Sequence, residues 1–421
     1  MRNRERTLIA FFGHPDVFED FYPHYHVDQR SFATKWANTG SHEFLRLIER
    51  EVGDVIWYEF SLDPELNEAR HEYVGCIIRF FSSSWLHRKL WRLFYLPKSA
   101  WRWRSAYRTY SLFASYLAPL SWRFLWKIWR ERPDIIFVQD YSTGRFDVLQ
   151  ILARAMGSRF VAYHAGSKPE TYVGSLLRRW TLPRADMLIL SSQSEFEMLA
   201  SRFHVPRNKL QTVLTPIDIA VFRPRDRSKA CQLAGLLVSR RYLLFVGRLD
   251  DRVKRVSALI HVFGKLSERF SDVDLIIIGD GPDVEALTTL KETLPVGRCE
   301  FLGWLASKEL LSVYYNVAEC LILPSISEGF PTVVGEAIAC GTPVVGSAVG
   351  GVSELVIPGK TGWLFPPGDD DALQDALTEV LEHPEILKNM RSNARVIAEQ
   401  RVAPAAVAVQ LRECLTGKSD K

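Results

Sequence analysis

Short apolar segments with the length of β-strands alternate with longer amphipathic segments along nearly the whole chain, and this alternation limits the fold more than any other feature. It favours parallel sheets covered by helices on both faces, because parallel strands need long crossover connections. We expect a helix after Gly40 with Ser41 as its cap, a helix over Val256–Phe270, and helical structure over Asp371–Leu415. The predicted strands are Thr7–Phe12, Asp54–Phe60, Cys76–Phe80, Asp134–Gln139, Arg159–His164, Met187–Leu190, Tyr242–Val246, Asp274–Ile278 and Cys320–Leu323.

The length of 421 residues exceeds what one hydrophobic core usually organises, so we expect two domains. The proline-containing segment Thr212–Pro224 is predicted to link them. The N-terminus has neither the apolar core nor the cleavage site of a signal peptide, and no apolar run approaches the length of a membrane span. Six scattered cysteines without a C-x-x-C pair favour a reducing, cytoplasmic compartment.

Two glutamates eight residues apart, Glu328 and Glu336, flank a predicted loop-to-helix junction. The loop follows the strand Cys320–Leu323, and Pro331 suits the first position of the helix. Amides at such a helix N-terminus favour phosphate; here they belong to Phe330, Thr332 and Val333. The helix dipole alone could explain Glu328. It does not explain Glu336, because a carboxylate among small apolar residues normally needs a partner.

Two cations follow the strand Tyr242–Val246: Gly247 is followed by Arg248, and Lys254 comes six residues later. Arg presents a planar fork to phosphate oxygens and Lys a mobile point charge, so together they suit a diphosphate. The alternative is surface ion pairing with the neighbouring Asp250 and Asp251.

Two further glycine-containing turns end strands at Gly279 and next to Leu302, in the segments IGDGP and FLGW. The first lacks the third glycine of a dinucleotide fingerprint. The second would let backbone groups of Leu302 or its neighbours read a nucleobase edge. The segments GGVSELV and GKTGWLFPPGD are predicted to be loops that close the domain.

From about residue 240 to 370 these motifs resemble the donor half of the retaining glycosyltransferases grouped with glycogen and sucrose synthases, the glycosyl-transferases group 1 family. The resemblance implies the GT-B fold, an α/β architecture in which two Rossmann-like doubly wound domains face each other across a cleft. Residues 1–218 would form the acceptor-binding domain and residues 219–395 the nucleotide-sugar donor domain. Residues 396–421 would form a helix that crosses back to the first domain.

The resemblance also implies roles for individual residues. Arg248 and Lys254 would contact the donor pyrophosphate, Glu328 would orient the donor sugar, and Glu336 would reach the ribose hydroxyls. His164, after a first-domain strand, would lie near the donor sugar, although a lone histidine is more often structural. The full predicted site comprises His164, Gly247, Arg248, Lys254, Gly279, Leu302, Glu328, Gly329, Phe330, Pro331, Thr332, Val333 and Glu336.

The chain departs from the family pattern at two places. Thr215-Pro216 replaces the usual Asn-Gly ahead of Asp218, and an aromatic, acidic insertion follows Gly13 and His14 in place of a short glycine-rich turn. We therefore expect Gly13 and His14 to lie in an unusual acceptor loop. No carboxylate pair with metal-ligand spacing is present between apolar strands, so we expect neither a metal nor a cofactor beside the nucleotide-diphosphate sugar.

Residues 79–132 hold seven of the twelve tryptophans and twelve Lys and Arg residues against one acidic residue, Glu131. Trp122, Trp126 and Trp129 recur at helical spacing beside a basic stripe, which is typical of a helix on an anionic membrane surface. Two alternatives remain: the tryptophans pack on the sheet under snorkelling arginines, or the basic face binds an acidic polymer. Nucleic acid is not expected, because no recognition fold accompanies the patch.

The sequence thus predicts a retaining, metal-independent glycosyltransferase that uses a UDP- or GDP-sugar. Its acceptor would be a lipid-linked or surface-polysaccharide precursor at the inner face of the cytoplasmic membrane. Two alternatives are a GT-B-type sugar-nucleotide epimerase and a catalytically silent sugar-nucleotide-binding subunit on a membrane.

Overall fold

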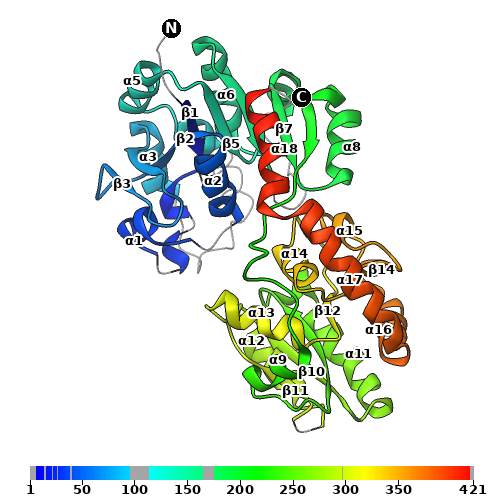
Figure 1. Cartoon of the computed structure of the whole chain (residues 1–421). Helices are drawn as coiled ribbons and strands as arrows, with labels where there is room; N and C mark the ends of the chain where they lie inside the picture. Colours follow the sequence, from blue (N-terminus) through cyan, green and yellow to red (C-terminus); the bar gives the residue numbers. More distant parts are fainter. Residues whose placement is uncertain are drawn as a thin grey trace. The chain divides into compact units, whose positions relative to one another are not determined.

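The structure, a computed structural model, describes residues 6–13, 16–20, 22–25, 27–37, 40–94, 113–164, 175–295 and 297–417. The chain forms two compact units (Figure 1). The first comprises Met1–Val213 and Ala408–Lys421, and the second comprises Leu214–Val407. The boundary between Val213 and Leu214 lies inside the segment that the sequence predicts to be the linker.

The first unit contains an eight-stranded sheet with the order β3-β4-β2-β1-β5-β6-β7-β8. Only β3 among these strands runs antiparallel to its neighbour. Helix α2 (Gly40–Glu51) packs on one face, where Phe44 contacts Tyr163, and α5 (Trp122–Glu131) packs on the other, where Phe124 contacts Phe12. The strands are β1 Thr7–Phe12, β2 Gly53–Ser61, β3 Glu68–Arg70, β4 Ile77–Ser82, β5 Ile135–Gln139, β6 Arg159–Tyr163, β7 Met187–Leu190 and β8 Leu210–Thr212.

The second unit contains a fully parallel sheet with the order β11-β10-β9-β12-β13-β14. Strand β9 therefore lies between β10 and β12, and successive connections leave it in opposite directions, as in doubly wound sheets. The strands are β9 Arg241–Val246, β10 Val273–Ile278, β11 Cys299–Phe301, β12 Cys320–Leu323, β13 Val344–Ser347 and β14 Gly362–Phe365.

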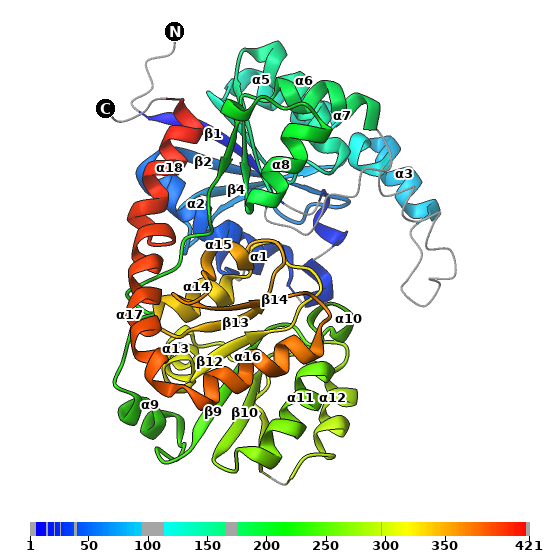
Figure 2. The same cartoon turned by 90° about the vertical axis from the view of Figure 1, so that its right-hand side faces the viewer.

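Helices cover both sheets (Figure 2). The other α-helices in the described part of the first unit are α1 Gln29–Thr34, α3 Trp85–Phe94, α6 Gly144–Met156, α7 Ser175–Thr181 and α8 Gln193–Arg202. Those of the second unit are α9 Arg227–Ala234, α10 Asp251–Lys254, α11 Val256–Arg269, α12 Val284–Lys291, α13 Lys308–Val317, α14 Thr332–Ala339, α15 Val352–Leu355, α16 Asp370–Glu382 and α17 Pro384–Arg401. The last helix, α18 (Pro404–Thr416), carries the chain from the second unit into the first.

The predicted strands are confirmed to within one or two residues at each end, whereas several local details differ. Ser41 does not cap α2; it lies inside the helix and donates to Gln139 Oε1 at 2.8 Å. Pro331 is the N-cap of α14, with extended backbone, rather than its first helical residue. The prediction of loops for GGVSELV and GKTGWLFPPGD is wrong in part, because they contain α15 and the edge strand β14, each only four residues long.

Candidate active site

The predicted donor residues gather along the carboxyl edge of the second sheet. Gly247 follows β9, Gly279 follows β10, Leu302 follows β11 and Glu328 follows β12. Because parallel strands end at the same edge, these loops are neighbours. The divergence between β10–β9 and β9–β12 is the place where doubly wound sheets bind ligands.

Lys254 and Glu328 meet across this divergence. Lys254 Nζ lies 2.5 Å from Glu328 Oε1, and the Ser325 hydroxyl donates to the same oxygen at 2.6 Å. The Glu328 side chain is 8% exposed and the Lys254 side chain 18% exposed, so the pair is largely shielded from water. A backbone hydrogen bond from Ile326 N to Val253 O at 2.8 Å fixes the two loops to each other. The alternative in which the cations pair with Asp250 and Asp251 does not hold for Lys254: Asp250 pairs with Arg252 at 3.5 Å, and Asp251 accepts from the Ser257 hydroxyl.

Helix α10 is short, and its end is held by an unusual backbone conformation. Arg255 has φ 51 and ψ 43, a left-handed conformation that costs a non-glycine residue roughly 1–2 kcal/mol. Its guanidinium pairs with Asp370 at 3.0 Å, and Asp251 accepts from both the amide and the hydroxyl of Ser257. These contacts turn the chain sharply from α10 into α11 and leave Lys254 at the end of the last α10 turn.

Glycines let loop backbones approach each other closely at two places on this edge. A Cβ on Gly279 would lie 1.8 Å from the carbonyl oxygen of Gly247, so the ends of β10 and β9 approach more closely than side chains permit. A Cβ on Gly350, whose φ is +45, would lie 1.9 Å from the carbonyl oxygen of Glu328. Gly351 N also donates to Gly329 O at 2.6 Å. The GGVSELV segment thus supports the loop that carries Glu328.

Helix α14 begins directly after this loop. The amides of Thr332 and Val333 belong to its first turn, where no helical carbonyl is available to accept from them. Glu336 lies in the second turn and is partly exposed although its neighbours on the helix are buried. Its Oε2 accepts from the hydroxyl of Tyr315, on α13, at 2.8 Å. The sequence pattern therefore required a partner for Glu336 but did not identify Tyr315.

Two further predicted donor residues, Arg248 and Leu302, follow strands at the same edge of the sheet. Arg248 is exposed, one residue after Gly247 at the end of β9. Leu302 donates its amide to Ile277 O at 3.0 Å, so only its carbonyl remains for a nucleobase. The Leu302 carbonyl and the backbone groups of its neighbours remain the groups predicted to bind a nucleobase.

His164 follows β6 at the carboxyl edge of the first sheet and is buried. Its Nδ1 lies 2.5 Å from Glu195 Oε1, its Nε2 lies 3.9 Å from Asp140 Oδ1, and the Tyr141 hydroxyl donates to Glu195. Burial disfavours the imidazolium, but the hydrogen bond and charge of Glu195, with the charge of Asp140, raise the pKa of His164 above its ordinary value. Asp140 has φ 75, a further strained position at this edge.

Gly13 lies at the end of β1, and His14 lies outside the described residues. The Gly13 carbonyl accepts from the buried Arg145 at 2.5 Å, and a Cβ on Gly13 would lie 2.5 Å from the Trp57 ring. The following insertion contributes to a hollow of about 580 Å³. Its lining is apolar and acidic: Phe18, Glu19, Pro23, Val27, Asp28, Gln29, Asp63 and Glu65.

The basic, tryptophan-rich segment is described over residues 79–94 and 113–132. On α5, Trp122, Trp126 and Trp129 are 78%, 51% and 46% exposed, while Phe124 and Ile128 point into the core. The alternative in which the tryptophans pack on the sheet is wrong for these three. Trp91 is buried, and its ring centre lies 5.9 Å from that of His87, whereas Trp101 and Trp103 lie outside the described residues.

Cations accompany the exposed rings. The Arg130 guanidinium lies 5.2 Å from the Trp126 ring centre, and that of Arg132 lies 5.8 Å from the Trp129 ring centre. Glu131 is occupied by Arg79 at 2.8 Å and by Lys127 at 3.2 Å. Helix α5 therefore has one apolar face in the core and one aromatic, cationic face in solvent.

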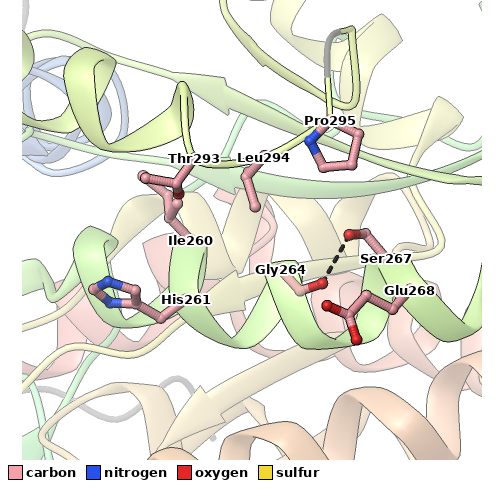
Figure 3. A pocket seen from close by; sticks show the side chains of 8 residues that line it. All are labelled: Ile260, His261, Gly264, Ser267, Glu268, Thr293, Leu294 and Pro295. Atoms are coloured by element: carbon pink, nitrogen blue, oxygen red, sulfur yellow. Dashed lines mark hydrogen bonds between the residues drawn. The ribbon is translucent and has the colours of Figure 1, made fainter.

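Another hollow, of about 470 Å³, lies on α11 beside the turn that follows α12 (Figure 3). Its lining includes His261, Glu268 and Leu294 and none of the predicted site residues. Within the described ranges, no helix is long and apolar enough to cross a membrane, and no three His, Cys, Asp or Glu side chains cluster as metal ligands. All six cysteines are buried and unpaired with one another.

Comparison with known protein families identifies the family to which this edge of the second sheet is similar. The profile of the glycosyl transferases group 1 matches residues 234–396, which hold Lys254, Glu328 and Glu336, and the profile of glycosyltransferase family 4 matches residues 54–221. Residues 234–396 form a glycosyl transferases group 1 domain. Its two doubly wound units are those of the GT-B fold.

Curated relatives match over part of their length. The D-inositol 3-phosphate glycosyltransferase of Mycolicibacterium smegmatis is 32% identical over 228 residues, which are 52% of this chain and 51% of that protein. The N-acetyl-alpha-D-glucosaminyl L-malate synthase of Bacillus anthracis is 31% identical over 191 residues, 45% of this chain and 49% of that protein. This chain thus spans about half the length of the curated relatives it matches.

Solved structures match over nearly the whole chain and support the fold. HepE from Anabaena, in complex with UDP, has a TM-score of 0.72 at 18% identity and covers 98% of this chain and 100% of its own. Sucrose-phosphate synthase from Thermosynechococcus elongatus has a TM-score of 0.69 at 20% identity, covering 96% and 97%. WaaG, a glycosyltransferase involved in lipopolysaccharide biosynthesis, has a TM-score of 0.63 at 14% identity, covering 97% and 100%.

Proposed function

We propose that this chain is a glycosyltransferase that moves a sugar from a UDP- or GDP-sugar to an acceptor, with retention and without a metal. The observation that carries the proposal is the ion pair between Lys254 and Glu328, which spans the divergence of the second sheet directly ahead of the α14 N-terminus. Structures of the similarly folded HepE with UDP and with UDP-glucose support a nucleotide-sugar donor.

In this proposal the diphosphate lies between Lys254 and the first-turn amides of α14. Negative charge grows on the diphosphate as it departs, so a cation and aligned amides stabilise the transition state more than the ground state. Arg248, one residue beyond Gly247, is proposed to add a second cation. These groups would take the place that a divalent metal occupies in other sugar transferases.

Glu328 is proposed to orient the donor sugar rather than to attack it. One carboxylate oxygen accepts from both Lys254 and Ser325, and a carboxylate with two such donors is a weaker nucleophile. Glu336, held from α13 by Tyr315, is proposed to bind the ribose hydroxyls. His164, with its raised pKa, is proposed to contribute a charged hydrogen-bond donor near the donor sugar.

The acceptor is proposed to be lipid-linked or a precursor of a surface polysaccharide, and it would be met at the inner face of the cytoplasmic membrane. The exposed Trp122, Trp126 and Trp129 with Arg130 and Arg132 support this, because tryptophan rings suit the headgroup region and each cation near an anionic surface contributes about 1 kcal/mol. The likeness in fold to WaaG adds a glycosyltransferase of lipopolysaccharide biosynthesis as a precedent.

A thermal-shift screen of UDP- and GDP-sugars tests the donor assignment, because binding to the native state raises the melting temperature whatever the acceptor is. We expect one nucleotide class to stabilise the protein and the other to have little effect. Products of the stabilising sugar nucleotide are then followed by mass spectrometry. Epimerised donor would identify an epimerase, and binding without any turnover in the presence of membranes would identify a silent binding subunit. No stabilisation by any sugar nucleotide would contradict the donor assignment.

Co-sedimentation with vesicles tests the membrane assignment separately. The variant Trp122→Ser/Trp126→Ser/Trp129→Ser should lose binding to phosphatidylglycerol vesicles that the wild type binds at low salt, and added salt should weaken wild-type binding. Leu233→Ser/Leu237→Ser, which removes two exposed apolar side chains from the second unit, is the matched control and should bind as the wild type does. Equal sedimentation of all three proteins would refute the role of α5.

A further inference from the structure

We propose that Tyr315 is a positioning residue that makes the donor site select ribonucleotides over deoxyribonucleotides, through its hydrogen bond to Glu336. The inference rests on the proposed role of Glu336 at the ribose. Tyr315 is fully buried on α13, and its hydroxyl donates to Glu336 Oε2 at 2.8 Å. It is a residue to which the sequence pattern gave no role.

Several contacts fix the tyrosine ring in one place. It meets the Phe222 ring at a centroid distance of 6.1 Å and an interplanar angle of 66°. The Tyr315 carbonyl accepts from the Thr342 hydroxyl at 2.6 Å, which ties this turn of α13 to the chain just beyond α14. A phenol held this rigidly offers its hydrogen in one direction only, so it selects one rotamer of the Glu336 side chain.

The direction of this hydrogen bond is also set. Burial, followed by the charge and hydrogen bond of Glu336, raises the pKa of Tyr315 well above its ordinary value, so the phenol remains a donor. An ionised carboxylate accepts hydrogen bonds at about four positions on its two oxygens. The hydrogen bond from Tyr315 uses one of these positions, so it does not by itself exhaust the capacity of the carboxylate as an acceptor.

An oriented acceptor matches the chemistry of ribose. The 2′- and 3′-hydroxyls of a ribonucleotide are two adjacent donors, and a fixed carboxylate can accept from them without first losing rotamer freedom. A deoxyribonucleotide lacks one of these donors and leaves part of the carboxylate unsatisfied in a partly buried site. Selectivity should then depend on Tyr315 even though the phenol itself does not touch the nucleotide.

The alternative is a purely structural role, in which Glu336 serves only as the hydrogen-bond acceptor for the buried Tyr315 hydroxyl. On that reading, loss of the hydroxyl changes stability alone, or it changes the affinity of all nucleotides by the same factor. On the positioning reading, loss of the hydroxyl changes the ratio of two affinities. The two roles therefore predict different ratios of ribonucleotide to deoxyribonucleotide affinity, a quantity that does not depend on the stability of the variant.

Isothermal titration calorimetry of the full chain with UDP and GDP, and with their 2′-deoxy and 3′-deoxy forms, tests the proposal. We expect the wild type to prefer the ribonucleotide over at least one deoxy form by about tenfold or more, the scale of one charged hydrogen bond. Tyr315→Phe keeps the ring and should reduce that preference several-fold. Tyr314→Phe is the matched control, since the next residue on a helix points about 100° away, and it should keep the preference.

Each outcome can be assigned. If neither UDP nor GDP binds the wild type, the proposed function fails and the inference fails with it. If one of them binds and Tyr315→Phe keeps the wild-type preference, or weakens ribo and deoxy forms equally, the inference alone is overturned. Glu336→Gln provides a second route should Tyr315→Phe fold poorly: it must also lose the preference, and its retention of the preference would equally overturn the proposal.

Discussion

The carboxyl edges of the two sheets hold charged side chains in opposite ways. In the second unit, glycine contacts bring loop backbones together and leave Lys254 and Glu328 at a partly accessible position between β9 and β12. In the first unit, charged side chains hold one another and the loops in place: Glu195 and Asp140 flank His164, and the buried Arg145 and Arg178 donate to loop carbonyls. Backbone contacts thus shape the edge of the second sheet, and side-chain contacts shape the edge of the first. We expect glycine substitutions to disrupt the second edge and charge substitutions to disrupt the first.

The strongest disruption of the second edge should come from Gly350→Ala. The new Cβ would meet the Glu328 carbonyl, and the positive φ would be strained, so we expect a loss of about 2–4 kcal/mol of stability together with weaker nucleotide binding. Gly359→Ala is the control, because its φ is +74 but nothing lies within 4 Å of the added Cβ. It should cost only the backbone strain, roughly 1 kcal/mol. Equal melting temperatures for the two variants would show that the Gly350 contact does not shape the edge.

The first edge should respond to charge and pH. The raised pKa of His164 means that its imidazolium stabilises the native state fully below its ordinary value of 6.5, and that this stability is lost as pH rises through the raised value. Glu195→Gln removes the charge that bonds Nδ1, while Asp140 and Tyr141 remain beside it. The melting temperature of the wild type should therefore exceed that of the variant by a few degrees at pH 6.

Above the raised pKa the two melting temperatures should approach each other, because the imidazole is then neutral in both proteins. Melting curves between pH 6 and pH 9, recorded in one salt concentration, would follow this convergence. A constant difference across the range would mean that Glu195 acts on His164 only as a packing partner. The claim that charge stabilises the edge of the first sheet would then be wrong.

The same contrast explains what could be predicted from the sequence. Loops built on glycine and proline have short local signatures, so the ends of β9 and β10 and the start of α14 were predicted to within one residue. Pairs such as His164 with Glu195, or Tyr315 with Glu336, join residues 31 and 21 positions apart. Their contact depends on how separate helices pack, which no local pattern records.

Short elements escaped prediction for a related reason. Strands β3 and β8 have three residues each and α15 has four, so their periodicity is too brief to detect. Ser41 was predicted to be a cap because it lies beside a helix start, yet its hydroxyl bonds Gln139, 98 positions away. Lys254 pairs with Glu328, 74 positions away, and not with a neighbouring aspartate.

The central claim is that Lys254 and the start of α14 hold the diphosphate of a nucleotide sugar. Its most direct test compares the affinities of UDP and uridine, or of GDP and guanosine, for the wild type, Lys254→Ala and Arg252→Ala by titration calorimetry. Arg252 is the control, since it lies on the same helix with 75% of its side chain exposed. We predict that Lys254→Ala reduces the preference for the diphosphate by about tenfold or more while nucleoside affinity changes little, and that Arg252→Ala keeps it. An undiminished preference in folded Lys254→Ala protein would contradict the account.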